Sequence, residues 1–330
     1  MIMPTAWLRH ACTLALGVSL TLGAYTAVQA QSYPDRPIRL IAPFPAGGLA
    51  DVLARAVGDE MSKTLGQPVI VENRAGAGGN IGAEAVAKAA PDGYTLLMTS
   101  AGILTANEFL YAKMPFDPAK DFVPVSNVAD MSMMVVVSPK VEAKSLADLV
   151  KLAKANPGKL NFGSPGVGTT GHLGLALLMH AADIKLTHVP YKGAAPAITD
   201  LLAGQIDGVV DNPPTVLPHI EAGKLNPLAV AGKQRMAQLP NLPTTAEAGI
   251  ANFEASSWFG IAAPTGTPPA IIARLHKEIA TAVKQPVMRE RFAKSGARLL
   301  GNTPEEFAQQ IKTDRKMWGD VIKAAGITPN

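Results

Sequence analysis

The chain has 330 residues, a net charge of +4 at pH 7, 5% aromatic residues and a single cysteine. The mild, dispersed charge argues against a nucleic-acid-binding protein, because no basic run is interleaved with aromatic side chains. One cysteine excludes a disulfide framework, and the length is sufficient for two ordinary domains.

The first thirty residues have the pattern of a secretory signal. Arg9 and His10 form a basic flank, residues 11–24 form an apolar run, and residues 27–30 place small side chains where a signal peptidase reads them. The apolar run is shorter than the roughly 20 residues that span a bilayer. We predict cleavage after about Ala30 and a mature protein in the periplasm. An uncleaved membrane anchor is the alternative.

Strand and helix signals alternate in the first half of the mature chain. The predicted strands are 38–43, 69–72 and 94–99, and the predicted helices start at residues 49 and 81. Gly66 ends the first of these helices, and the Pro-Asp-Gly sequence at 91–93 ends the second. This βαβαβ order predicts a parallel sheet with right-handed crossovers.

The second half continues the α/β pattern, and Ser145 is a candidate N-cap. Its predicted strands are 135–138, 160–163, 186–190, 206–211 and 228–231, and its predicted helices are 146–155, 173–182, 195–203 and 216–222.

The C-terminal part is helical. Amphipathic patterns cover residues 268–284 and 286–294, and residues 303–306 (TPEE) form a capping box that opens a last helix. We expect Gly319 to interrupt that helix and Gly326 to end it.

Two loops, residues 44–48 and 164–171, each follow a predicted strand and open a predicted helix. Their small residues leave backbone N–H groups accessible, and the positive end of the helix dipole lies at the same point. One such loop in each half indicates a cleft that holds an anion from both sides. Ordinary tight turns are the alternative for each loop taken alone.

Enzyme motifs are incomplete. The glycines of residues 166–171 (GVGTTG) match the dinucleotide-binding pattern, but no acid ends the next predicted strand, and Asp200 lies inside a helix. Ser164 does not form a nucleophile elbow, because Phe162 occupies a position that requires glycine. A secreted hydrolase using Ser164 and His172 is the alternative from another class. The scattered histidines predict no metal site.

Four segments together resemble one known family. They are YPDRPIRLIAPFPAGGLADVLAR (33–55), VIVENRAGAGGNIGAEAVAKAAPDGYTLL (69–97), LNFGSPGVGTTGHL (160–173) and VPYKGAAPAITDLLAGQID (189–207). In this order they are similar to the Bug-type solute receptors, the periplasmic substrate-binding components of tripartite tricarboxylate transporters. The resemblance covers the whole mature chain.

The resemblance implies an α/β fold of the type II periplasmic binding protein class, with two domains joined by two crossover strands around a ligand cleft. It places domain I at 31–130 and 256–330 and domain II at 131–255. It implies a monomer that binds a small carboxylate (a di- or tricarboxylate, an acidic amino acid or an aromatic acid) and delivers it to membrane transporter subunits. No catalytic residue, metal, cofactor or nucleic acid is implied. A sensor that presents the ligand to a signalling protein is an alternative.

The resemblance also implies ligand-binding residues, with main-chain groups and ordered water holding the carboxylate. The alternative role for Asp51 is a charge at the N-terminus of a helix, and the alternative role for Tyr191 and Asp211 is hinge or turn structure. The implied residues are Phe44, Ala46, Gly48, Asp51, Thr99 and Ser100 in domain I, and Ser164, Thr169, Thr170, His172, Tyr191 and Asp211 in domain II.

One segment departs from the family pattern. Ile103 and Leu104 stand where many relatives carry a small polar pair. This predicts a ligand with an apolar or aromatic body and fewer hydroxyl groups than citrate.

Overall fold

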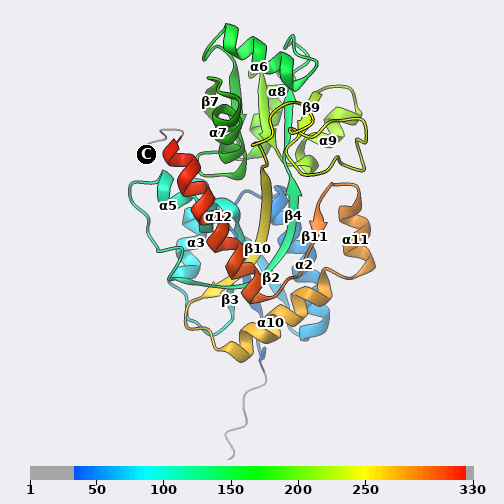
Figure 1. The fold of residues 1–330 in the computed structure, drawn as a ribbon. Helices are drawn as coiled ribbons and strands as arrows, with labels where there is room; N and C mark the ends of the chain where they lie inside the picture. Colours follow the sequence, from blue (N-terminus) through cyan, green and yellow to red (C-terminus); the bar gives the residue numbers. More distant parts are fainter. Residues whose placement is uncertain (1–32, 325–330) are drawn as a thin grey trace, which may run out of the picture. The chain divides into compact units, whose positions relative to one another are not determined.

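The computed structural model describes residues 33–324, and the chain from Arg36 onward forms one compact unit of two β-sheets flanked by helices (Figure 1). The first sheet has the strand order β11-β4-β10-β3-β1-β2, and the second has the order β7-β6-β8-β5-β9. The predicted α/β class is therefore confirmed. The predicted signal peptide lies outside the described residues.

The first sheet contains β1 (Ile38–Ala42), β2 (Val69–Asn73), β3 (Thr95–Ser100), β4 (Phe122–Ser132), β10 (Ser256–Pro264) and β11 (Arg298–Leu299). The second contains β5 (Met134–Val137), β6 (Asn161–Ser164), β7 (Thr187–Pro190), β8 (Gly208–Asp211) and β9 (Asn226–Val230). The helices are α2 (Leu49–Leu65), the 3₁₀ turn η1 (Ala77–Gly79), α3 (Asn80–Ala87), α4 (Ala101–Thr105), α5 (Asn107–Leu110), α6 (Leu146–Ala155), α7 (Thr170–Ala182), α8 (Ala194–Ala203), α9 (Pro213–Glu221), α10 (Pro269–Ala282), α11 (Pro286–Ala293) and α12 (Pro304–Ala324).

The pairing of the strands is only partly the predicted one. β1 pairs in parallel with β2 and β3, and β6 with β7 and β8, as the alternation of strands and helices predicts. The strands β4, β5 and β10 run antiparallel to their neighbours. The prediction of a parallel sheet covered only the βαβαβ segment of β1, β2 and β3, whereas β4, β5 and β10 continue from one sheet to the other instead of returning through a helix.

Local signals at helix ends act as predicted. Gly66 ends α2 in the left-handed conformation, with φ of 70°. The Ser145 side chain accepts a hydrogen bond from the Asp148 amide at the start of α6. At the start of α12, Thr303 and Glu306 each accept a hydrogen bond from the other's backbone N–H, which is the capping box.

Gly319 does not interrupt the last helix, contrary to the prediction. α12 runs without a break from Pro304 to Ala324. A Cβ atom at Gly319 would lie 3.0 Å from the Phe109 ring, so glycine here permits close packing of α12 on α5. The second expected stop, Gly326, lies outside the described residues.

Two adjacent segments connect the sheets. Met133 joins β4 to β5, and Ala255 precedes β10, which leads back to the first sheet. The Met133 amide donates to the Ala255 carbonyl (2.9 Å), the Ala255 amide to the Ala231 carbonyl (2.9 Å), and the Ala231 amide to the Met133 carbonyl (2.8 Å). The predicted domain boundaries at 130/131 and 255/256 remain a prediction.

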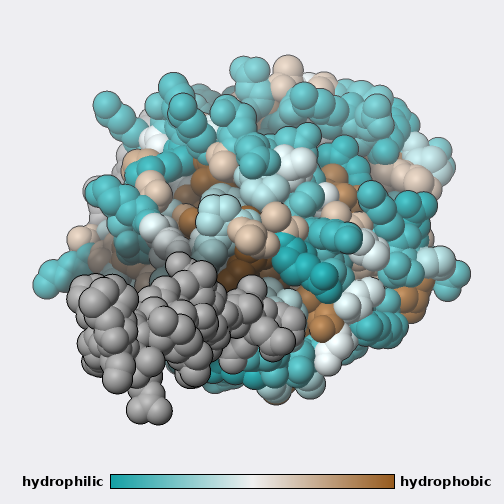
Figure 2. Space-filling model, turned by 90° about the horizontal axis from the view of Figure 1, so that it is seen from below, coloured by the Kyte–Doolittle hydropathy of each residue, from teal (hydrophilic) through white to brown (hydrophobic). Residues whose placement is uncertain are grey.

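The face of the molecule seen from below is mostly hydrophilic (Figure 2). Figure 2 shows hydrophilic side chains over most of the visible face, with hydrophobic residues mainly in the recesses between them. Among residues 33–324, no helix combines the length and the apolar character needed to cross a bilayer.

Candidate functional site

A cavity of about 520 Å³ lies at the carboxyl ends of β1, β3, β6 and β8, where segments of both sheets face one another. Ligands of open α/β sheets bind at this edge, because the loops that follow the strands converge there. We call it the cleft cavity. Its lining consists of Phe44, Pro45, Ala46, Gly47, Gly48, Leu49, Ala50, Ser100, Pro165, Thr169, Thr170, Lys192, Gly193, Ala194, Ala195, Pro196, Ile198, Thr199, Leu202, Asp211, Asn212, Pro214, Thr215, His219 and Phe259.

The first loop, residues 44–48, is shaped by an acid behind it. Gly47 has φ of 80° and donates its amide hydrogen to Asp51 (2.9 Å). Asp51 also accepts from the Asn73 amide (2.9 Å) and pairs with Arg55 (2.9 Å). Burial alone would raise the pKa of Asp51, but the hydrogen bonds from Arg55, Gly47 and Asn73 outweigh it and lower that pKa. Asp51 is therefore ionised, and its carboxylate holds the first loop in place.

The second loop, residues 164–171, leads into the 13-residue helix α7. The Thr169 hydroxyl donates to the Gly166 carbonyl (2.7 Å) and accepts from the His172 amide (3.5 Å), so Thr169 caps the helix. Thr169 and Thr170 line the cavity beside the positive end of the helix dipole. The 17-residue helix α2 begins at Leu49 on the opposite side. The N-termini of α2 and α7 thus border one cavity from opposite sides, an arrangement suited to an anion. The N-termini of α8 and α9 also line this cavity.

A histidine pair supports the second loop. The rings of His172 and His188 are stacked with centroids 4.3 Å apart. His188 Nε2 and the Ser164 hydroxyl oxygen are 2.6 Å apart, and the Gly168 amide donates to His172 Nδ1 (3.4 Å). Burial lowers the pKa of both rings to about 4, so the pair is neutral at pH 7.

The Ser164–His188 contact does not form a hydrolase centre. Ser164 is 1% exposed and does not line the cavity. Among the described residues no carboxylate is hydrogen-bonded to His188 or His172, so the orienting third group of a triad is missing. The predicted alternative partner, His172, contacts the loop backbone and His188 instead of Ser164.

The second loop also contacts the first sheet's helices. The Tyr111 hydroxyl donates to the Val167 carbonyl (2.9 Å). A Cβ atom on Gly102 would overlap the Gly168 carbonyl, and one on Gly168 would overlap the Asn107 amide. These glycines permit the backbone of the loop to lie directly on α4 and α5.

The structure brings seven of the twelve predicted residues to the cavity wall. These are Phe44, Ala46, Gly48, Ser100, Thr169, Thr170 and Asp211. The other five, Asp51, Thr99, Ser164, His172 and Tyr191, lie behind it. Thr99 alternates with Ser100 along β3 and faces away, and the Tyr191 hydroxyl donates to Asp200 (2.7 Å). Burial and Asp200 raise the pKa of Tyr191 to about 12. The ligand contacts of all twelve remain a prediction.

Sequence reasoning missed much of the wall from the second sheet. Lys192, Ile198 and Leu202 come from the β7–α8 segment, and His219 comes from α9. The rule that ligands bind at strand ends, applied to β7 and β8, would have found these segments. Phe259 lies on β10, which the family resemblance alone predicted, as a crossover strand, and no residue of that strand was predicted as a site residue.

The apolar pair Ile103 and Leu104 gives no information on the ligand. Both residues are buried, at 0% and 1% exposure, in the core of the first sheet, and neither lines the cleft cavity. The structure therefore gives no support to the prediction that this pair indicates an apolar or aromatic ligand. The apolar part of the wall is provided instead by Phe44, Leu49 and Phe259.

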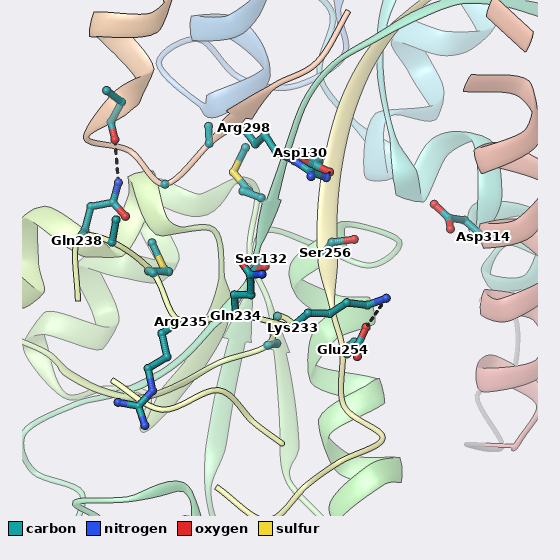
Figure 3. A pocket seen from close by; sticks show the side chains of 18 of the residues that line it. Asp130, Ser132, Lys233, Gln234, Arg235, Gln238, Glu254, Ser256, Arg298 and Asp314 are labelled. Atoms are coloured by element: carbon teal, nitrogen blue, oxygen red, sulfur yellow. Dashed lines mark hydrogen bonds and ion pairs between the residues drawn. The ribbon is translucent and has the colours of Figure 1, made fainter. Parts of the chain in front are cut away.

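A second cavity, of about 710 Å³, lies against the crossover segments β4 and β10 (Figure 3). We call it the crossover groove. Its charged side chains already have partners: Arg298 pairs with Asp130, Lys233 with Glu254. Asp314 accepts a hydrogen bond from the Trp258 indole. No helix begins at its wall, so it lacks the anion-binding geometry of the cleft cavity.

Metal binding has no support within the described part of the chain. No three His, Cys, Asp or Glu side chains of residues 33–324 are grouped as a metal site requires.

The chain matches a family model. Residues 53–327 match the model described as "Tripartite tricarboxylate transporter family receptor". Protein BugT of Bordetella pertussis is 40% identical over 307 residues, which are 93% of this chain and 94% of that protein.

Solved structures are similar to this chain over most of its length. Rpa4515 of R. palustris, solved with adipate, has a TM-score of 0.86 and 37% identity, covering 90% of this chain and 100% of that chain. MatC of Rhodopseudomonas palustris, solved with bound malate, has a TM-score of 0.84 and 33% identity, covering 88% of this chain and 100% of that chain.

Proposed function

Because the chain belongs to the tripartite tricarboxylate transporter receptor family, we propose that it binds a small carboxylate in the cleft cavity and delivers it to the membrane subunits of such a transporter. The resemblance to Bug-type receptors is confirmed by these comparisons. The family consists of periplasmic solute receptors and not of enzymes. We therefore place the mature protein in the periplasm and propose that it acts as a monomer.

The observation that carries the proposal is the pair of helix N-termini at one cavity. α2 and α7 begin at the wall with the first and second loops, one beside each sheet. Accessible backbone N–H groups at both points would hold a carboxylate without an arginine. The relatives solved with adipate and malate hold carboxylic acids, which favours the same ligand class here.

The free energies of the individual interactions favour binding of the carboxylate from both sides of the cavity. A charge-assisted hydrogen bond contributes about 1.5–3 kcal/mol, and a helix terminus adds about 0.3–1 kcal/mol. Micromolar affinity requires about 8 kcal/mol, after the cost of association. One loop does not reach that value, so we propose that the segments carrying the two loops close around the ligand.

The test is a thermal-shift panel on the mature protein, unfolded and refolded first to remove any ligand retained during purification. The panel contains mono-, di- and tricarboxylates, acidic amino acids and aromatic acids. A ligand at 100 times its Kd should stabilise the protein by about 2.7 kcal/mol. One responding class would establish the receptor function and identify the substrate family. If no member of the panel raises the melting temperature of the correctly refolded protein, the proposal is refuted.

A further inference from the structure

Two buried polar side chains from different sheets face the cleft cavity with an oxygen that has no partner. Ser100 ends β3, and Asp211 ends β8. Both are 2% exposed and both line the cavity. Ser100 Oγ and Asp211 Oδ2 have no hydrogen-bond partner among the described residues. Buried polar atoms in native proteins are normally paired, so a bound molecule is the natural source of the missing partners.

Asp211 is the more informative of the two. A hydroxyl such as that of Ser100 can donate or accept, whereas an ionised carboxylate only accepts. Asp211 Oδ1 already accepts from the Asn212 amide (2.7 Å), which leaves Oδ2 as the free acceptor. Burial raises the pKa of Asp211 to about 6, against the hydrogen bonds from the Asn212 amide and the Thr215 hydroxyl, which lower it, so we use pH 7.5 to keep Asp211 ionised.

A ligand that carries only carboxylates does not complete this site. Its oxygens accept hydrogen bonds, and its charge has the same sign as Asp211, so the two groups would repel each other in a partly desolvated cavity. Among residues 33–324 no ion pair forms at Asp211, and Lys192, on the same wall of the cavity, is exposed to solvent.

We propose, as a refinement that rests on the proposed function, that the ligand carries a hydrogen-bond donor, an ammonium or a hydroxyl group, in addition to its carboxylate. Asp211 accepts a hydrogen bond from this donor, while the two loops hold the carboxylate. Ser100 is placed to contact the same polar end from the first sheet. The substrate class is thus an amino acid or a hydroxy acid, and the apolar wall formed by Phe44, Leu49 and Phe259 accepts its hydrocarbon part.

The test compares ligands that share a carbon skeleton and differ only in the donor. Suitable sets are succinate, malate and aspartate, and phenylpropanoate, phenyllactate and phenylalanine. Affinities are measured by titration calorimetry at pH 7.5 on the refolded wild type, on Asp211→Asn and on Asp211→Ala. Asp183→Asn is the matched control, because it removes one exposed carboxylate outside the cavity. Thermal melting without ligand verifies that each variant is folded.

In every set that binds, we expect the wild type and Asp183→Asn to prefer the amino or hydroxy acid over the plain acid by at least tenfold. Asp211→Asn and Asp211→Ala should reduce that preference to about twofold or less. The hydroxy and amino members tell which donor is used. Equal or tighter binding of the plain acids by the wild type would overturn the inference and leave the receptor function intact, as would an unchanged preference in both Asp211 variants. Absence of binding by all members would instead overturn the proposed function.

Discussion

The first loop exposes residues 45–47 to solvent, whereas Gly168 and Thr169 of the second loop are buried. Both loops follow a strand, precede a long helix and use a glycine with φ of 80°, at Gly47 and at Gly168. The first loop is supported by one buried acid, Asp51. The second is supported by the histidine pair and by its contacts with α4 and α5. The second loop is therefore held rigidly by its neighbours. In the first loop, side chains can be substituted at little cost in stability.

The largest expected difference between the loops comes from substituting their two glycines by alanine. Both substitutions place a side chain at φ of 80°, which costs about 1–2 kcal/mol. A Cβ atom at Gly47 has no neighbour within 4 Å, whereas one at Gly168 overlaps the Asn107 amide. We expect Gly168→Ala to lose about 3 kcal/mol or more of unfolding free energy and Gly47→Ala about 1 kcal/mol, by urea denaturation. Similar losses would show that the second loop is not held by its contacts.

The histidine pair should make the second loop acid-sensitive. Both rings have a pKa lowered from 6.5 to about 4, so the unfolded chain binds more protons than the folded protein between these values. Stability is fully present above about pH 6.5 and is lost as the pH falls toward 4, by on the order of 3 kcal/mol per ring.

His172→Phe keeps a stacked ring that cannot be protonated. Unfolding free energies at pH 7 and pH 4.5 should therefore differ less in this variant than in the wild type. The opposite contribution of Asp211, whose pKa is raised, is common to both proteins and cancels. If the unfolding free energy falls by the same amount between pH 7 and pH 4.5 in both proteins, the pair does not support the fold.

Removal of the acid behind the first loop should have a moderate effect. Asp51→Ala removes the acceptor of the Gly47 amide and one of the two acceptors of the Asn73 side-chain amide, which keeps the Phe44 carbonyl. We expect a loss of about 1–3 kcal/mol of unfolding free energy and weaker ligand binding, because the loop loses its shape. Asp59→Ala, which removes an exposed acid of the same helix, is the control. Unchanged affinity in Asp51→Ala would mean that the first loop does not contact the ligand.

The smallest effect is expected where the second loop meets α5. Tyr111→Phe removes the hydrogen bond to the Val167 carbonyl and leaves the ring in place. The expected loss is about 1 kcal/mol, together with an affinity decrease of less than tenfold. A larger decrease in affinity than in stability would indicate that this contact stabilises the ligated form in particular.

The sequence allowed prediction of both loops and of the helix starts behind them, because the signals are local. Gly66, Ser145 and residues 303–306 act on neighbours within a few positions. The strands β4 and β10 could not be predicted this way, since Pro124 and the polar Ser126 and Asn127 interrupt the apolar pattern and the pairing partners are distant in sequence.

The predicted site failed to separate residues on the cavity wall from residues behind it. Asp51 and His172 stand at helix starts, where a ligand contact is plausible from sequence alone. Their actual partners, Asn73 and His188, are 22 and 16 residues away in the chain, and only the tertiary structure brings them together.

Two matched substitutions test most directly whether the cleft cavity is the ligand site. Ala46 in the first loop and Ala237 in the crossover groove are both exposed, and each lines one of the two cavities. Each is replaced by tryptophan, and the responding carboxylate is titrated calorimetrically. We predict that Ala46→Trp weakens binding at least a hundredfold and that Ala237→Trp leaves the Kd unchanged. Loss of binding in Ala237→Trp with full affinity in Ala46→Trp would contradict the account and move the site to the crossover groove.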